Sequence, residues 1–188
     1  MKFAEQLALG HVGEQLVAQY IQRHGCGIVP SYDYSGKHGD KAPRLMFENS
    51  GLVLPDLDVC KRGRQRFWAE VKSYWNAYPN RTLGKDVHGI TGRLYRHYLE
   101  VEHVSGCPVF VFVLEVETGA LLLVRLSAVQ VHPCMCRACK DGQQCIARIH
   151  SGIYWTRESM RLLDRFDAAT MQGLRSRWVV SHRRKGTA

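Results

Sequence analysis

The sequence contains no run of apolar residues near the roughly 20 that a membrane-spanning helix needs. Its first residues, MKFAEQLALGHVGEQ, also lack the uninterrupted apolar core of a secretion signal. No internal repeat is visible along the chain, which argues against repeat architectures. We therefore expect a cytoplasmic protein with no membrane partner.

Acidic residues are scarce relative to basic ones. There are 17 Asp and Glu against 26 Lys and Arg, a formal charge of +9 in 188 residues. Such an excess attracts polyanions over long range, so nucleic acid is the leading expected partner, with DNA favoured over RNA. The hydrophobic content of 45% indicates a globular protein. We expect residues 1–180 to form a single domain and the basic residues 181–188 to form a disordered tail.

The cysteine count is odd, since the chain has seven, and four of them lie between residues 134 and 145. An odd number in an expected cytoplasmic protein argues against a disulfide framework. Cys136 and Cys139 have the two-residue gap that suits one metal ion. We expect a Cys-rich insertion at residues 132–150 that holds structural zinc through Cys134, Cys136, Cys139 and Cys145. Free or redox-active thiols and an iron–sulfur cluster remain open as alternatives.

Hydrophobic periodicity predicts an α/β fold. The three-and-four spacing of Val12, Leu16 and Tyr20 predicts a helix that ends near residue 25, and a similar pattern predicts a second helix from about residue 91 to 104. The remaining apolar runs predict an edge strand at 27–34, hairpins at 51–74 and 108–126, a short strand at 152–155 and a helix at 157–166. We expect a mixed central sheet built from the two hairpins and flanked by the first two helices.

The first hairpin gathers polar side chains on one face. Because side chains alternate along a strand, Asp56 and Asp58 share a face, as do Glu70 and Lys72, which lie roughly 7 Å apart along their strand. If the turn at residues 61–65 closes the hairpin symmetrically, Asp56 lies directly opposite Glu70. The apolar residues between them then face the core, and a slip of one residue would destroy this agreement.

Two carboxylates at cross-strand distance repel each other unless a positive charge lies between them. A divalent cation such as Mg²⁺, held by these carboxylates, waters and phosphate oxygens, would supply that charge. Lys72 could then orient or deprotonate an attacking water or offset charge on a phosphate. In the alternative interpretation, Glu70 and Lys72 form only an ion pair of little energetic value, which leaves Asp56 unexplained.

The strings PD at residues 55–56 and EVK at residues 70–72 resemble the signature of the PD-(D/E)XK nuclease superfamily, which has the restriction-endonuclease-like fold. Glu14, after glycines in the first helix, and the helix and strand that follow the hairpin extend the resemblance over approximately residues 5–126. Holliday-junction-resolvase-type and phage-encoded nucleases are similar members. The cysteine-rich segment lies outside the resemblance.

The resemblance implies a nuclease that depends on Mg²⁺ or Mn²⁺. It assigns metal binding to Asp56, Glu70 and the backbone carbonyl of Val71, an assisting role to Glu14, directly or through water, and orientation of the attacking water to Lys72. Some relatives use an acidic residue at the position of Asp58 instead of Asp56. The resemblance is also compatible with a homodimer, because many members of the superfamily act in pairs.

Residues for nucleic-acid contact can be nominated as well. The basic turn supplies Arg62 and Arg64 for phosphate contacts, and the later helix supplies Arg93, Arg96 and Tyr98. In the structural alternative, the two helix arginines form a solvated face and Tyr98 belongs to the core. Two other functions stay open, a non-catalytic zinc-containing nucleic-acid-binding protein and an adaptor or inhibitor that uses a nuclease-like scaffold.

Overall fold

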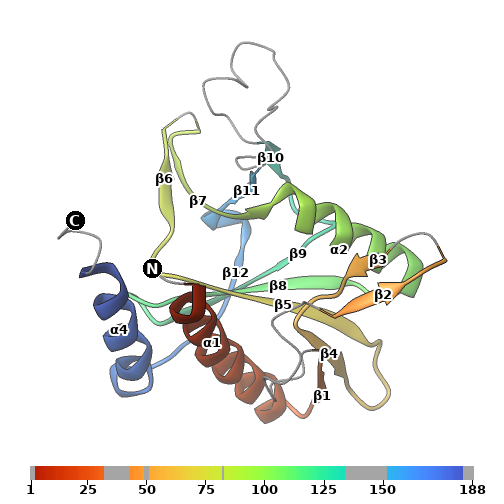
Figure 1. Ribbon diagram of the computed structural model, residues 1–188, viewed down its shortest axis with the longest axis horizontal. Helices are drawn as coiled ribbons and strands as arrows, with labels where there is room; N and C mark the ends of the chain where they lie inside the picture. Colours follow the sequence, from red (N-terminus) through yellow and green to blue (C-terminus); the bar gives the residue numbers. More distant parts are fainter. Residues whose placement is uncertain (1–2, 32–42, 49–50, 82, 134–151, 184–188) are drawn as a thin grey trace.

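A computed structural model describes residues 3–31, 43–48, 51–81, 83–133 and 152–183 (Figure 1). The predicted zinc ligands, Cys134, Cys136, Cys139 and Cys145, fall outside these residues, so the zinc site stays a prediction. None of the helices among the described residues is long and apolar enough to cross a membrane.

The central sheet has mixed direction, as predicted, and it has two strands more than the four of the two predicted hairpins. Its order is β1 (Gly27–Pro30), β4 (Leu57–Cys60), β5 (Phe67–Tyr74), β8 (Val109–Glu115), β9 (Ala120–Arg125) and β12 (Arg161–Arg165). β5 and β8 run parallel, and the other neighbours are antiparallel. Both predicted hairpins are present, although residues 51–53 leave the first one and form a strand of another sheet, and β1 is an edge strand. Pro30, which cannot donate a ladder hydrogen bond, is accommodated at that edge.

Helices cover both faces of this sheet (Figure 1). α1 (Phe3–Arg23) packs on one face, where Val17, Ile21 and Val71 belong to one core cluster. α2 (Gly92–Ser105) packs on the other face, where Val101 joins Val111 in a second cluster. Thr91 caps α2 by accepting a hydrogen bond from Leu94 N, and Gly106 ends the helix at φ 64°, a left-handed conformation that favours glycine. These two helices match the predicted ones.

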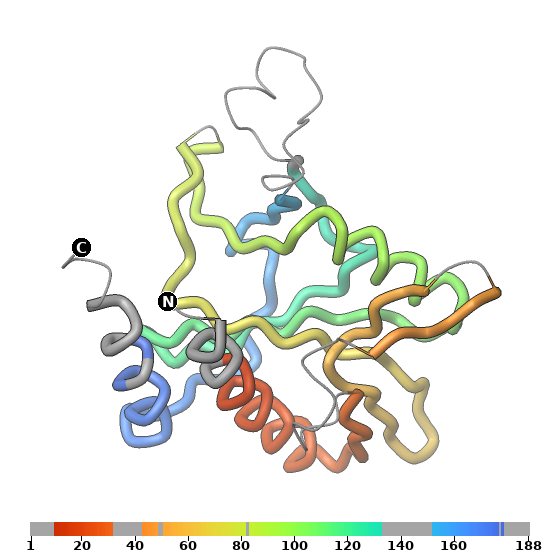
Figure 2. Tube along the Cα trace, viewed as in Figure 1, coloured from red at the N-terminus to blue at the C-terminus, as the bar shows by residue number. Residues whose placement is uncertain are grey.

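A third helix, α4 (Ala168–Arg183), was not predicted. It lies beside α1 in the traced chain (Figure 2). Met171 and Leu174 are buried against Leu114, and the rings of Trp75 and Trp178 lie 6.2 Å apart. Because α4 ends at Arg183, the first three residues of the expected tail are helical, and residues 184–188 lie outside the described part of the chain.

The predicted helix at 157–166 is wrong. A single 3-10 turn, η1 (Arg157–Ser159), is followed by strand β12, which pairs with β9 and has an irregularity between Leu162 and Asp164. The backbone groups on the outer edge of β9 need partners, and β12 provides them. Pairing with a distant strand therefore overrides the local spacing of Leu162, Leu163 and Phe166, which is compatible with a helix.

A second, four-stranded sheet stands at one end of α2 (Figure 1). Its order is β10 (His132–Pro133), β11 (Gly152–Thr156), β7 (Lys85–Thr91) and β6 (Tyr78–Asn80). The sequence predicted only β11 among these strands. A separate two-stranded sheet, β2 (Arg44–Met46) with β3 (Gly51–Val53), lies along α2 at its other end.

Candidate active site

The β4–β5 hairpin has the predicted register. Leu57 lies opposite Ala69, and Val59 lies opposite Phe67. Extending this register by one residue places Asp56 opposite Glu70. Leu57, Val59, Ala69 and Val71 are buried in the cluster beneath α1. The polar residues therefore share the other face of the hairpin, as the alternation of side chains requires.

Asp56 and Glu70 are almost fully buried, with relative exposures of 5% and 1%. Asp56 Oδ2 accepts a hydrogen bond of 2.8 Å from Val71 N. Burial raises the pKa of Asp56 well above its ordinary value, repulsion by Glu70 and Glu14 adds to this rise, and the Lys72 ammonium and the Val71 N–H oppose it. Ionised Asp56 is therefore under electrostatic strain in this fold.

Glu70 has one satisfied and one unsatisfied carboxylate oxygen. Oε1 forms an ion pair with the Lys72 ammonium, whereas buried Oε2 has no hydrogen-bond partner among the described residues. A buried carboxylate oxygen without a partner carries a desolvation cost, which a bound cation would offset. This orphaned oxygen leaves Glu70 able to bind a cation.

The carboxylates beside Lys72 favour its charged form. Burial by itself would lower its pKa, but the carboxylates of Glu70 and Asp56 raise the pKa above its ordinary value. As an ammonium, Lys72 can orient a water or offset phosphate charge, whereas a cation bound by the same carboxylates would oppose this rise in its pKa. The side chain is 31% exposed, which leaves it accessible from solvent.

The donor set fits Mg²⁺ or Mn²⁺, because carboxylate and carbonyl oxygens are the ligands that these hard cations prefer. Val71 N faces Asp56, and the N–H and C=O of one residue in an extended strand point to the same edge, so the Val71 carbonyl faces the site as well. No group of three or more His, Cys, Asp or Glu side chains within the described ranges is arranged to hold a metal. The two carboxylates would thus need the carbonyl, waters or substrate oxygens to complete the coordination.

Glu14 reaches the site through α1. Its side chain is mostly buried, lies 3.5 Å from His11 Nδ1 and is close enough to Asp56 to raise the pKa of that carboxyl. Gly13 allows this approach, because a Cβ at position 13 would collide with Ser73 Oγ of β5. The glycine before Glu14 therefore has a packing role that the sequence pattern alone did not explain.

Asp58 has a different environment from Asp56. Both of its carboxylate oxygens accept hydrogen bonds from the guanidinium of Arg66, which also lies 5.6 Å from the centre of the Trp68 ring. Asp58 is therefore not a solvated strand position, and its side chain is buried. Because Arg66 already compensates the charge of Asp58, Asp56 is the better candidate for a metal ligand.

The nominated nucleic-acid contacts divide into exposed and buried residues. Arg62 and Arg64 are exposed in the turn between β4 and β5, and Arg93 and Arg96 are exposed on α2. Tyr98 is only 2% exposed and belongs to the core cluster under α2, so it cannot offer its ring to a substrate. The prediction that Tyr98 contacts nucleic acid is therefore wrong, because its position on α2 faces the sheet.

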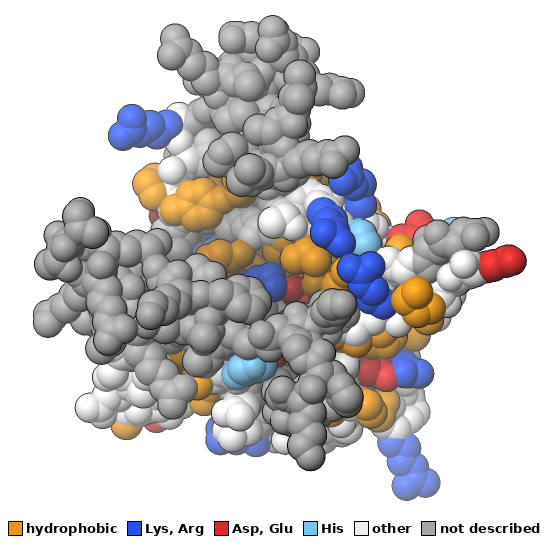
Figure 3. Space-filling model, viewed as in Figure 1, with side chains coloured by type: hydrophobic (Ala, Val, Ile, Leu, Met, Phe, Trp, Pro, Cys, Tyr) orange, Lys and Arg blue, Asp and Glu red, His pale blue; other side chains and the backbone are white. Residues whose placement is uncertain are grey.

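Arg44 is a basic residue that the sequence reasoning missed. It lies close to Arg93 and Arg96 around His97, whose pKa is lowered by burial and, further, by these three guanidinium groups. Lys and Arg side chains gather over α2 in the space-filling view (Figure 3). Arg44 comes from β2, a strand far from α2 in the sequence, so no local pattern could have shown this grouping.

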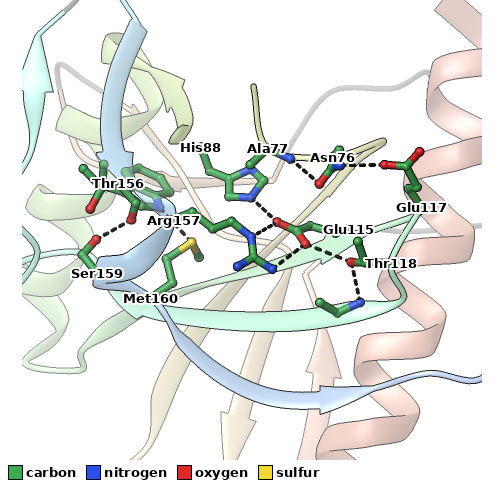
Figure 4. A network of polar contacts seen from close by, with 12 residues as sticks. Asn76, Ala77, His88, Glu115, Glu117, Thr118, Thr156, Arg157, Ser159 and Met160 are labelled. Carbon is green, nitrogen blue, oxygen red and sulfur yellow. Dashed lines mark hydrogen bonds and ion pairs between the residues drawn. The ribbon is translucent and has the colours of Figure 1, made fainter. Parts of the chain in front are cut away.

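A second buried polar cluster surrounds Glu115 at the end of β8 (Figure 4). Its carboxylate accepts hydrogen bonds from Arg157 Nε and Nη2 at 2.7 and 2.9 Å, from Thr118 Oγ1 at 2.9 Å, and pairs with His88 Nε2 at 2.9 Å. His88 lies on β7 and Arg157 on η1, so Glu115 joins the second sheet to the central sheet. The sequence reasoning did not single out any of these residues.

Comparison with known proteins gives little further information. No protein-family model matches the chain, and no curated protein matches it. Among solved structures, the chain is similar to Hjc, a Holliday junction resolvase from the archaeal hyperthermophile Archaeoglobus fulgidus, with 10% sequence identity and a TM-score of 0.49 over 80% of this chain and 90% of that chain. A likeness of this size establishes neither a shared fold nor a shared activity.

Proposed function

We propose that the protein is a nuclease that hydrolyses phosphodiester bonds of nucleic acid with the help of Mg²⁺ or Mn²⁺, with DNA favoured over RNA. The observation that carries this proposal is the buried pair of Asp56 and Glu70, with an orphaned Glu70 oxygen, beside the Lys72 ammonium. Burying two neighbouring carboxylates costs several kcal/mol unless positive charge compensates them. Lys72 supplies one positive charge for the two carboxylates, so a cation would complete the compensation.

Each residue has a separate role in this proposal. Asp56, Glu70 and the Val71 carbonyl would hold the cation, and Glu14 would assist through a water. The cation supplies Lewis-acid polarisation of the scissile phosphate and of a water. Lys72 donates hydrogen bonds that orient the attacking water and offsets the charge that develops on the phosphate. The ion pair with Glu70 holds the Lys72 ammonium at the site.

The exposed arginines would provide phosphate contacts that do not depend on sequence. Arg62 and Arg64 lie in the β4–β5 turn, and Arg44, Arg93 and Arg96 gather on and beside α2. We expect the affinity for DNA to fall steeply as salt increases, because each neutralised phosphate releases counterions. Replacing Arg93 and Arg96 together with glutamine should reduce the salt slope by roughly 2, measured by titration at several salt concentrations. An unchanged slope would remove α2 from the contact surface.

The first test is a cleavage assay with labelled single-stranded, duplex and branched DNA and with RNA, in Mg²⁺, Mn²⁺ or EDTA. We expect cleavage that needs the cation and that falls about a hundredfold or more in the Lys72→Ala variant, because a pre-positioned charge at the reacting phosphate is lost. Salt-sensitive binding without cleavage of any substrate would instead indicate a non-catalytic nucleic-acid-binding protein.

Asp58→Asn tests which aspartate is the metal ligand. We expect this variant to keep cleavage and to lose about 1 kcal/mol of unfolding free energy, because the partner Arg66 is half exposed and its ion pair is screened by solvent. Cleavage assays and urea unfolding measure the two effects. A loss of cleavage as large as that of an Asp56 variant would transfer the ligand role to Asp58.

A further inference from the structure

Tyr78 and Tyr154 lie on one face of the second sheet. Directly opposed residues of antiparallel strands share a face, and Tyr154 lies opposite Gly89 while Tyr78 lies opposite Val87, two positions away on the same strand. The two tyrosine rings are 5.8 Å apart with an interplanar angle of 85°, an edge-to-face contact. This face therefore carries a pair of tyrosines in contact with each other.

Two glycines let the Tyr154 ring lie against the sheet. A Cβ on Gly89 would be 2.3 Å from Ile153 O and 2.5 Å from Tyr154 Cδ1, and a Cβ on Gly152 would collide with the Tyr154 hydroxyl. The ring thus occupies space that side chains at both glycine positions would need. An aromatic surface fixed in this way loses little conformational entropy when a planar ligand stacks on it.

Other aromatic side chains near the site are engaged in packing. Trp155 is fully buried and donates to Met160 Sδ, Trp75 packs against Trp178, and Trp68 packs on the core and donates to Ser105 Oγ. Tyr78 is 39% exposed, more than any of these tryptophans, and Tyr154 is partly exposed, as are Trp68 and Trp75. Tyr78 therefore offers a more accessible ring than these tryptophans, and Tyr154 lies in contact with it.

A continuous series of contacts joins this pair to the candidate active site. Tyr74 follows Lys72 by two positions on the same face of β5, a separation of roughly 7 Å. Its hydroxyl donates a hydrogen bond to the carbonyl of Gly89, which lies opposite Tyr154. The Glu115 cluster fixes β7 to β8 through His88, so the second sheet is held in place relative to β5 (Figure 4).

We propose that Tyr154 and Tyr78 form a stacking platform for an unpaired base, so that the preferred substrate class has a single-stranded segment beside the cleaved bond. This inference rests on the proposed nuclease function for the position of that bond. Every base has a π-face, so stacking of this kind tolerates any sequence. The formal charge of +9 and the exposed Arg81 after β6 suit the phosphates of such a strand.

The test measures binding in EDTA, so that no cleavage occurs. A single strand containing 2-aminopurine and a duplex of the same sequence are titrated, at one salt concentration, into the wild type and into Tyr154→Leu, Tyr154→Phe, Tyr78→Leu and Tyr78→Phe. We expect each leucine variant to bind the single strand about tenfold more weakly, to reduce quenching of 2-aminopurine and to lower the ratio of single-strand to duplex affinity. The phenylalanine variants keep a ring and should behave like the wild type.

The outcomes separate this inference from the proposed function. If both leucine variants bind the single strand as the wild type does, the platform is overturned, even if the protein proves to be a metal-dependent nuclease. If quenching depends on the rings but no substrate is cleaved in Mg²⁺ or Mn²⁺, the platform stands and the nuclease is overturned. Should Tyr154→Leu not fold, the more exposed Tyr78 variants decide the result, with thermal unfolding of every variant as the check.

Discussion

The Asp56→Asn variant is expected to lose cleavage by about a thousandfold or more and, in EDTA at neutral pH, to unfold at a higher temperature than the wild type. The loss of activity follows because Lewis-acid polarisation is worth several kcal/mol and asparagine is a poorer ligand for Mg²⁺. The gain in stability follows because the variant removes a buried negative charge that Glu70 and Glu14 repel. Asparagine can still accept the hydrogen bond from Val71 N.

The pH dependence of stability provides an independent check. The pKa of Asp56 is raised in the folded state, so the fold binds a proton that the unfolded chain releases at lower pH. The wild type should therefore lose stability as pH rises from the ordinary aspartate range through the raised pKa. Asp56→Asn should show a flatter profile over the same range, measured by thermal unfolding in EDTA.

Added Mg²⁺ or Mn²⁺ should raise the unfolding temperature of the wild type, because a ligand that binds only the folded state stabilises it by mass action. The shift should be much smaller in Asp56→Asn and should persist in Asp58→Asn, which is the matched control on the same strand face. If the wild type and Asp56→Asn respond equally to the cations, Asp56 is not a metal ligand.

Replacing Glu115 with glutamine is expected to cost about 3 kcal/mol of unfolding free energy at pH 7. Burial alone would raise the pKa of Glu115, but hydrogen bonds from His88, Arg157 and Thr118 lower it from 4.5 to about 2. A difference of this size between the pKa values of Glu115 in the folded and unfolded states corresponds to about 3 kcal/mol of unfolding free energy. The glutamine cannot satisfy the Arg157 guanidinium with two charged oxygens.

The sign of the pH effect is opposite to that at Asp56. A lowered carboxyl pKa stabilises the fold above the ordinary value, and this stabilisation is lost as pH falls from about 4.5 towards 2. Urea unfolding at pH 7 and pH 3 should therefore show a smaller difference between the wild type and Glu115→Gln at pH 3. The control is Glu117→Gln, since Glu117 is exposed and its carboxylate accepts a hydrogen bond from the neutral side chain of Asn76. Equal losses in the two variants would contradict the role of the buried cluster.

The sequence by itself was sufficient for the parts of the fold that depend on local periodicity. Helices α1 and α2, the two central hairpins and the placement of Asp56 opposite Glu70 were all predicted. They were predictable because strand alternation and helix spacing are set over a few residues, and because a one-residue slip between β4 and β5 would break the shared core face of Leu57, Val59, Ala69 and Val71.

Tertiary structure decided what distant residues do to one another. Arg66 neutralises Asp58 and leaves Asp56 beside Glu70, a distinction that alternation alone could not make because both aspartates share a face. Tyr98 is buried because the sheet covers its side of α2, and residues 161–165 form a strand because β9 offers an edge. The second sheet brings Tyr78 against Tyr154, and β2 brings Arg44 towards α2. Each of these outcomes depends on contacts between segments far apart in the chain, and no local pattern encodes such contacts.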